Sequence, residues 1–262
     1  IEARYRLLPM TRGILSGLFT PEQANYHLDL IERYLAAPDG VRLMDRPMTY
    51  RGGRQRYFKR AENSPFFGRE IGLMYTHAHL RYAEALAVLG QADRFIEALR
   101  KAVPVNLQAV VPTANPRQSN CYFSSSDAAF STRYEVNERY ADLFRGTVPF
   151  NGGWRIYSSG PGIFVKLVLS HLFGIRRRAD KIEIDPVLPR SLNGLSLTTD
   201  RLGTPARIRY FVSGKNKGLR RIEINGRPVP FSRAANPYRL GGAVIPDRLI
   251  TESEKKSTPE IK

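Results

Sequence analysis

Two motifs between residues 116 and 162 combine hydroxyl, amide, guanidinium and aromatic side chains. Residues 116–127 read PRQSNCYFSSSD, and residues 151–162 read NGGWRIYSSGPG. Each motif leads into an apolar pattern with the period of a helix. This mixture of side chains suits a ligand that carries both hydroxyl groups and an anionic group. We therefore expect these two motifs to hold the chemistry of the chain.

The second motif contains the run Ser158-Ser159-Gly160-Pro161-Gly162. Glycine lacks a Cβ, so main-chain N–H groups can approach a ligand closely. A helix that begins near Pro161 would add its positive end and its free N–H groups, which together make an anion site. The alternative is a serine-capped helix with a Gly-Pro turn, and the local sequence does not decide between the two.

The first motif could recognise a sugar. The guanidinium of Arg117 and the amide of Gln118 can hydrogen-bond sugar hydroxyls. The rings of Tyr122, Phe123 or Trp154 could stack on a pyranose face. The alternative is a loop that packs its aromatic rings into the core.

The histidines do not predict a metal site. His77 and His79 lie two residues apart on a predicted helix, so they point to different faces and cannot chelate one ion together. His27 and His171 have no partner at ligand spacing. We expect no metal and no cofactor.

The sequence also gives no support for covalent catalysis by a nucleophile or for a catalytic pair of carboxylates. Cys121 has no visible base beside it, and we interpret it as a small buried thiol. Asp127, Glu135 and Glu138 are the nearest carboxylates, but their spacing does not single out the pair that glycoside hydrolysis uses. Asp127 is interpreted as a cap or a first-turn charge of a helix. No Gly-x-Ser-x-Gly or phosphate-loop lysine motif is present.

Helical patterns precede and separate these motifs. Thr20, Pro21 and Gln23 form a helix start with a capping box. Residues 69–89 and 91–102 predict two helices joined at Gly90 into an antiparallel hairpin. Further helices are predicted at 126–144 and 161–173, and residues 38–68 predict a long irregular loop.

After Gly174 the pattern changes to short alternating runs. Residues 181–186, 206–212 and 221–224 alternate polar and apolar, and Asn-Gly and Ser-Gly pairs lie between them. These runs predict an antiparallel β unit. Residues 252–262 are polar without an apolar period and predict a disordered tail.

Length and composition narrow the class. The 262 residues are 42% hydrophobic, enough for a sizeable core, and no apolar run reaches the length of a membrane span. The formal charge of +17 is scattered along the chain, which favours a small anionic substrate over nucleic acid. The single cysteine fits a reducing compartment, and we expect the cytoplasm.

The motifs resemble the inverting glycoside phosphorylases of glycoside hydrolase family 94, and most closely their oligoglucan branch. The residues that carry this resemblance are 117–127 (RQSNCYFSSSD), 133–135 (RYE), 157–162 (YSSGPG), 184–189 (IDPVLP) and 192–195 (LNGL). It implies an (α/α)6 catalytic barrel followed by β-strands. In such enzymes phosphate attacks the anomeric carbon while an aspartic acid protonates the leaving oxygen, so no general base is required.

The resemblance also implies site residues by position. The family's phosphate pocket uses a helix histidine and a hydroxyl-glycine loop, which resemble His77 and Ser158-Ser159-Gly160; His79 competes with His77 for that role. The expected substrate-binding residues are Arg117, Gln118, Tyr122 and Trp154. No motif matches the family's acid, so we expect the aspartate to lie upstream of Ile1 and expect no catalytic residue in this chain.

The sequence therefore predicts a mainly α protein with a C-terminal all-β segment. Residues 1–175 would be the C-terminal part of an (α/α)6 toroid, 176–251 a β-strand region, and 252–262 a disordered tail. The chain opens on Ile1 with its first methionine at Met10, and we interpret it as a C-terminal fragment that is inactive alone. Expected partners are a β-glucan oligosaccharide and phosphate.

Two other functions stay open. One is the phosphorylase-like end of a cyclic β-1,2-glucan synthase, and the other is a non-catalytic module that binds carbohydrate or a polyanion. A homodimer is retained as a candidate assembly, because the sequence does not fix the oligomeric state.

Overall fold

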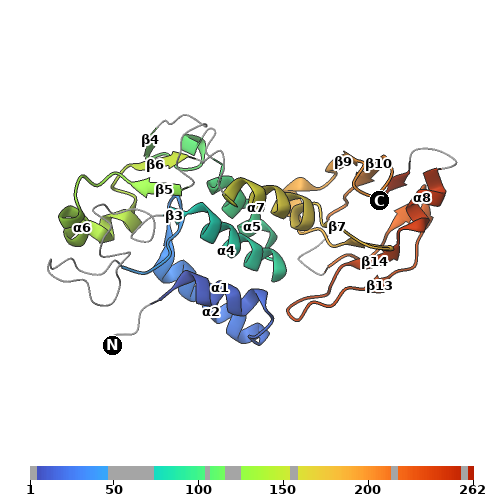
Figure 1. Cartoon of the computed structure of the whole chain (residues 1–262), viewed down its shortest axis with the longest axis horizontal. Coiled ribbons are helices and arrows are strands. Elements are labelled where there is room, and N and C mark those ends of the chain that lie inside the picture. The colour runs from blue at the N-terminus through green and yellow to red at the C-terminus, as the bar shows by residue number, and fades with distance from the viewer. Residues whose placement is uncertain are drawn as a thin grey trace. The chain divides into compact units, whose positions relative to one another are not determined.

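The computed structural model describes residues 5–46, 74–103, 107–115, 125–153, 159–213, 218–254 and 259–262 (Figure 1). The chain divides into two compact units. Unit 1 comprises Ile1–Ala85 and Glu97–Phe164, and unit 2 comprises Leu86–Ile96 and Val165–Lys262. Each unit is described by itself below.

Unit 1 begins with two packed helices, α1 (Leu7–Leu15) and α2 (Pro21–Leu35). The predicted helix start is confirmed. The Thr20 hydroxyl accepts from the Gln23 N–H at 3.2 Å, and the Gln23 side chain accepts from the Thr20 N–H at 3.0 Å. The apolar face of α2 is buried through Ala24, Leu28, Ile31 and Leu35. A short hairpin of β1 (Ala36–Ala37) and β2 (Gly40–Val41) follows.

Helices α4 (Thr76–Val88) and α5 (Ala92–Lys101) follow one another through a turn at Gly90, where the prediction placed it. Gly90 has a φ of +75°, a left-handed conformation that glycine adopts without steric cost. Helix α4 begins at Thr76, and Met74–Tyr75 before it form strand β3 rather than its first turn.

A four-stranded sheet in unit 1 was not predicted. Its order is β3-β5-β6-β4, and the other three strands are β4 (Ala114–Asn115), β5 (Ser125–Ala128) and β6 (Phe150–Gly153). The helix predicted at 126–144 is therefore only helix α6 (Arg133–Arg145). The helix begins late because the Thr132 side chain caps it, accepting from the Glu135 N–H at 3.2 Å. Asp127 lies in β5 opposite Asn151, not at a helix start.

One apolar cluster of unit 1 joins residues of this sheet and of α6. Val111, Val136, Leu143 and Phe150 are fully buried in one apolar cluster. A 3-10 turn, η1 (Leu107–Ala109), leads toward β4. Helix α7 (Ser159–Leu167) continues into a π-helical turn, η2 (Val168–Leu172), so the predicted apolar helix at 161–173 is confirmed with an earlier start.

The β unit predicted after Gly174 is present in unit 2 as two sheets. The first has the order β13-β14-β8-β7 and the second β12-β11-β15-β10-β9. Every pair given for them is antiparallel except β10 with β15, which is parallel. Their bounds are β7 Ile175–Arg178, β8 Lys181–Ile184, β9 Ser196–Thr199, β10 Ala206–Arg209, β11 Glu223–Ile224, β12 Arg227–Pro228, β13 Ser232–Arg233, β14 Ala243–Pro246 and β15 Glu260–Ile261. A 3-10 turn, η3 (Arg190–Leu192), precedes β9.

The end of the chain differs from the predicted disordered tail. Residues Arg248–Glu254 form helix α8, and β15 lies in the second sheet between β11 and β10. Ile261 is only 2% exposed. Burial of the Ile261 side chain and the hydrogen bonds of its neighbours stabilise β15. The strand is too short to show a period in the sequence.

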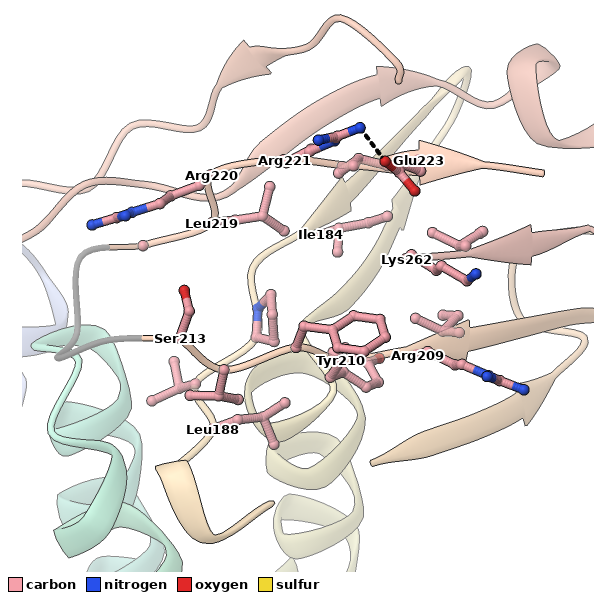
Figure 2. A pocket seen from close by; sticks show the side chains of 18 of the residues that line it. Ile184, Leu188, Arg209, Tyr210, Ser213, Leu219, Arg220, Arg221, Glu223 and Lys262 are labelled. Carbon is pink, nitrogen blue, oxygen red and sulfur yellow. Dashed lines mark ion pairs between the residues drawn. The ribbon is translucent and has the colours of Figure 1, made fainter. Parts of the chain in front are cut away.

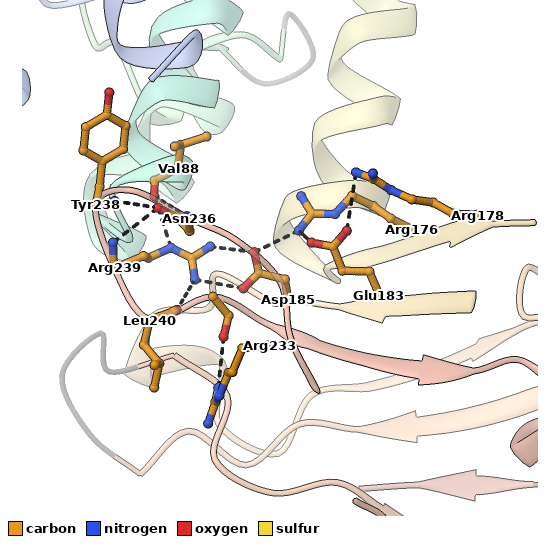
Figure 3. A network of polar contacts seen from close by, with 11 residues as sticks. Val88, Arg176, Arg178, Glu183, Asp185, Arg233, Asn236, Tyr238, Arg239 and Leu240 are labelled. Carbon is orange, nitrogen blue, oxygen red and sulfur yellow. Dashed lines mark hydrogen bonds and ion pairs between the residues drawn. The ribbon is translucent and has the colours of Figure 1, made fainter. Parts of the chain in front are cut away.

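In unit 2, a network of ion pairs and hydrogen bonds connects Arg239, Asp185 and the C-terminal end of α4 (Figure 3). The Arg239 guanidinium donates to both Asp185 oxygens at 2.8 Å and to the Val88 carbonyl at 3.2 Å. Asn236 donates to the same carbonyl at 3.0 Å, so two side chains cap the C-terminus of α4. Burial alone would raise the pKa of Asp185, but Arg239 and Arg176 together hold it below its usual value.

The described residues thus form a mixed α and β protein, with seven α-helices and several mainly antiparallel sheets, rather than a mainly α one. In the part of the chain that the structure describes, no helix is both long and apolar enough to cross a membrane.

Candidate functional site

The ends of three strands lie at one edge of the four-stranded sheet. Tyr75 at the end of β3 pairs with Ser125 at the start of β5, and Ser125 pairs with Gly153 at the end of β6. Strand β4 runs parallel to β6 and therefore ends in the same direction. The chain leaves the sheet there into residues 76–77, 116–124 and 154–158.

Most residues predicted to bind ligand belong to these three segments. Arg117, Gln118, Tyr122, Trp154 and Ser158 lie outside the described residues. The register shows that the strands bordering them end at one edge. Strand β5 alone separates β3 from β6, so the two strand ends lie two inter-strand spacings, about 10 Å, apart.

His77 lies in the first turn of α4, directly after β3. Its ring stacks on Tyr75 with 6.0 Å between centroids and 14° between planes. Partial burial lowers the pKa of His77, and the nearby Arg81 and Arg12 lower it further. The His77 ring is therefore neutral at pH 7. Its surroundings are positively charged, and a bound anion would offset part of that charge.

Sequence reasoning missed the two arginines near His77. Arg81 lies four residues after His77 on α4, and this spacing brings two side chains to one helix face. That spacing was a usable signal. Arg12 comes from α1, and nothing in the sequence pattern links it to α4. Part of the charge of Arg81 is offset by Glu84, whose carboxylate lies 2.6 Å away.

The N-terminus of α7 contributes the second candidate group. The helix begins at Ser159, two residues before the predicted start, so Ser159 and Gly160 belong to its first turn. Their N–H groups have no partner within the helix, as in the first turn of any α-helix. No acidic residue occupies this turn, and Gly160 is buried. A bound anion would interact favourably with this positive helix end.

His79, the competing candidate, is a core residue. It is 1% exposed; its Nε2 lies 2.8 Å from the Ala98 carbonyl, and its Nδ1 lies 3.3 Å from the Val41 N–H. Only the neutral tautomer that carries its proton on Nε2 satisfies both contacts. Burial lowers the pKa of His79 to about 4. Both ring nitrogens have protein partners, so His79 cannot bind phosphate in this conformation.

Two described carboxylates of unit 1 have structural partners. Glu135 accepts from the Ser131 N–H at 2.8 Å and pairs with Arg139 at 2.6 Å. Asp39 forms a fully buried pair with Arg42 at 2.7 Å, and that guanidinium lies over the Phe150 ring. The described ranges contain no group of three or more His, Cys, Asp or Glu side chains that could hold a metal ion.

Comparisons with known proteins agree with the resemblance predicted from the motifs. Residues 174–260 match the model of the glycoside phosphorylase C-terminal domain. A 1,2-beta-oligoglucan phosphorylase of Listeria innocua is 42% identical over 248 residues, which are 95% of this chain. An N,N'-diacetylchitobiose phosphorylase of Vibrio furnissii is 22% identical over 87% of the chain. The predicted resemblance to glycoside phosphorylases is confirmed.

The relatives are much longer than this chain. The matched region spans 22% of the Listeria protein and 26% of the Vibrio protein. A cyclic beta-(1,2)-glucan synthase of Rhizobium meliloti is 28% identical over 79% of this chain, which is 7% of that protein.

Proposed function

We propose that this chain is part of a β-glucan phosphorylase, because residues 174–260 match the model of the glycoside phosphorylase C-terminal domain. The observation that carries the proposal is the 42% identity with a 1,2-beta-oligoglucan phosphorylase across 95% of the chain. The substrate that this relative's name gives makes a β-1,2-linked glucan the first choice here. The helices of unit 1 would then be the last part of an (α/α)6 barrel.

The proposed reaction is an inverting phosphorolysis. A phosphate oxygen attacks the anomeric carbon of the terminal glucose and forms a new C–O bond. The glycosidic C–O bond breaks, and its oxygen takes a proton from an aspartic acid. The products are α-glucose 1-phosphate and a glucan shortened by one unit. Phosphate is already a nucleophile, so the reaction needs one carboxylic acid and no second carboxylate as a base.

The described geometry supports a phosphate site at the edge of the four-stranded sheet. His77 can donate a hydrogen bond to a phosphate oxygen and, once protonated, adds a positive charge beside it. The first turn of α7 adds N–H groups that have no partner within the helix. We propose that Ser158 completes this pocket and that the sugar is held by Arg117, Gln118, Tyr122 and Trp154. The proton donor would be an aspartate outside these 262 residues, so the chain alone would be inactive.

The test uses the intact protein with β-1,2-glucan oligosaccharides, with and without inorganic phosphate. The proposal predicts glucose 1-phosphate only when phosphate is present, with one glucan unit lost for each molecule formed. Reducing sugar that appears equally fast without phosphate would contradict it.

Three observations separate the two alternatives from the proposal and from each other. The similarity to a cyclic glucan synthase favours the synthase as the second candidate, and a glycosyltransferase region with membrane spans in the intact polypeptide would support it. A protein that binds oligosaccharide but forms no glucose 1-phosphate would be a binding module. Retention on heparin that collapses with salt would show a simple basic surface.

A further inference from the structure

Four residues at the junction of β3 and α4 alternate between the interior and the surface. Met74 is 2% exposed and Thr76 is 1% exposed, whereas Tyr75 is 38% exposed and His77 is partly buried. Successive side chains of an extended chain point to opposite sides, and α4 begins only at Thr76. Because Met74 and Thr76 point inward, the rings of Tyr75 and His77 lie together on the outer side of the junction.

These two outer rings form a stacked pair. Their centroids are 6.0 Å apart and their planes differ by 14°. Both values fall in the range that is favourable for offset stacked rings. A histidine in the first turn of a helix can otherwise adopt more than one rotamer. Contact with the Tyr75 ring favours the rotamer in which the imidazole of His77 lies nearly parallel to it.

The main chain of Tyr75 is attached to the sheet independently of its ring. Tyr75 pairs with Ser125 of β5, and Ser125 pairs with Gly153 of β6. Tyr75 therefore lies at the edge where the predicted ligand-binding segments begin. A ring that is carried by the sheet thus contacts a ring that is carried by the helix.

The side chain of Tyr75 does not have the contacts of a tyrosine that stabilises the fold. Tyr210, which lines a cavity of about 540 Å³ in unit 2, is such a tyrosine (Figure 2). It is 6% exposed, and its hydroxyl donates to the Phe173 carbonyl at 2.9 Å. The Tyr75 hydroxyl makes no hydrogen bond to a described residue, and its ring is partly in solvent. What the side chain of Tyr75 contributes is therefore its ring contact with His77.

The orientation of His77 matters because a hydrogen bond weakens steeply when its angle departs from linearity. Arg81 of α4 and Arg12 of α1 supply positive charge near His77. That charge attracts an anion from a range of directions. An imidazole N–H binds a phosphate oxygen well only when the ring points toward it.

We propose that Tyr75 is a positioning residue of the phosphate site. Its ring holds the imidazole of His77 in the orientation in which a ring N–H points at a phosphate oxygen. This role rests on the phosphate site proposed above, because Tyr75 acts through His77 and does not itself touch phosphate.

Calorimetric titration of the intact protein with inorganic phosphate tests this role. Tyr75→Thr removes the ring but keeps a residue that favours strands, and should weaken phosphate binding about threefold to tenfold. Tyr75→Phe keeps the ring and should restore the affinity. Tyr26→Leu is the matched control, because the exposed Tyr26 ring lies 5.9 Å from His27, which is not a predicted phosphate ligand. It should change the affinity less than about twofold.

A double-mutant cycle separates positioning from direct contact. If Tyr75 acts only through His77, Tyr75→Thr should change phosphate binding less than about twofold in the His77→Asn protein. Effects of the two substitutions that add in full would place Tyr75 against the phosphate itself and would overturn the proposal. Unchanged binding in Tyr75→Thr would also overturn it, as would binding in Tyr75→Phe that is as weak as in Tyr75→Thr.

The result for His77→Asn alone distinguishes this role from the proposed function. If His77→Asn leaves phosphate binding unchanged, the phosphate site itself is wrong and the role of Tyr75 fails with it. If His77→Asn weakens binding but Tyr75→Thr does not, only the role of Tyr75 is wrong.

A measurement on the unmodified protein decides the question if Tyr75→Thr unfolds. Nuclear Overhauser effects between the ring protons of Tyr75 and His77 should persist at saturating phosphate. Their loss on phosphate binding would overturn the proposal, because the two rings would then separate in the state that Tyr75 is expected to stabilise.

Discussion

Acid should destabilise this protein through His79, and His79→Gln should remove much of that sensitivity. His79 is neutral in the folded core because both its nitrogens have partners and its ring is almost completely removed from water. Its pKa is about 4 when folded, against about 6.5 in an unfolded chain. Between these values the unfolded state binds more protons, so the free energy of unfolding falls as the pH falls.

The size of the effect follows from the two pKa values. Integrating the proton difference from pH 8 to pH 5 gives a loss of about 2 kcal/mol, and the full loss below pH 4 is about 3 kcal/mol. The contribution of neutral His79 is thus complete above about pH 6.5 and is lost toward pH 4. Glutamine cannot take up a proton in this range, so the variant should lack this component of the loss.

Urea denaturation of both proteins at pH 8 and pH 5 measures the difference. His77→Gln is the matched control, since His77 lies on the same helix but is partly exposed. It should change the pH dependence less than His79→Gln does. An unchanged pH dependence in His79→Gln would refute the reasoning, as would an NMR titration that places the pKa of His79 near 6.5.

Three further predictions concern unit 2 and the anion site. Asp185→Asn leaves a buried guanidinium without its carboxylate and should cost about 3 kcal/mol of unfolding free energy, whereas Glu183→Gln keeps that pair and should cost less. Gly174→Ala places a Cβ 2.2 Å from main-chain atoms at a φ of +69°, so thermal unfolding should show a much larger loss than for Gly226→Ala, where φ is +76° and the space is open. Sulfate, measured by calorimetry, should bind several-fold tighter at pH 5.5 than at pH 8 through protonation of His77, and His77→Asn should abolish this dependence.

Local signals predicted most of the helices. The capping box at Thr20 and Gln23, the turn at Gly90 and the apolar run into η2 depend on neighbours in the sequence, and each is present. The same holds for the strands after Gly174, which alternate with a period of two.

Elements that are stabilised by partners distant in the sequence were not predicted. Strand β5 is held by β3 and β6, and it lies inside a stretch whose local pattern resembles a helix. Strand β15 has two residues and depends on β10 and β11. The buried pair of Asp39 with Arg42 likewise has no periodic signature.

The candidate site was predictable in part. Residue types and the family resemblance selected His77 and the serine-glycine run. The structure adds that the flanking strands end at one edge and that His79 is committed to the core. The sequence could not separate the two histidines, because the groups that bury and hydrogen-bond His79 come from residues distant in the chain.

The Michaelis constant for phosphate in the intact enzyme tests the central claim most directly. His77→Asn should raise the constant for phosphate about tenfold or more, since a hydrogen bond to a charged group is lost, while the constant for the glucan stays within about twofold. Phosphate and glucan constants that both match those of the unmodified enzyme would contradict the account.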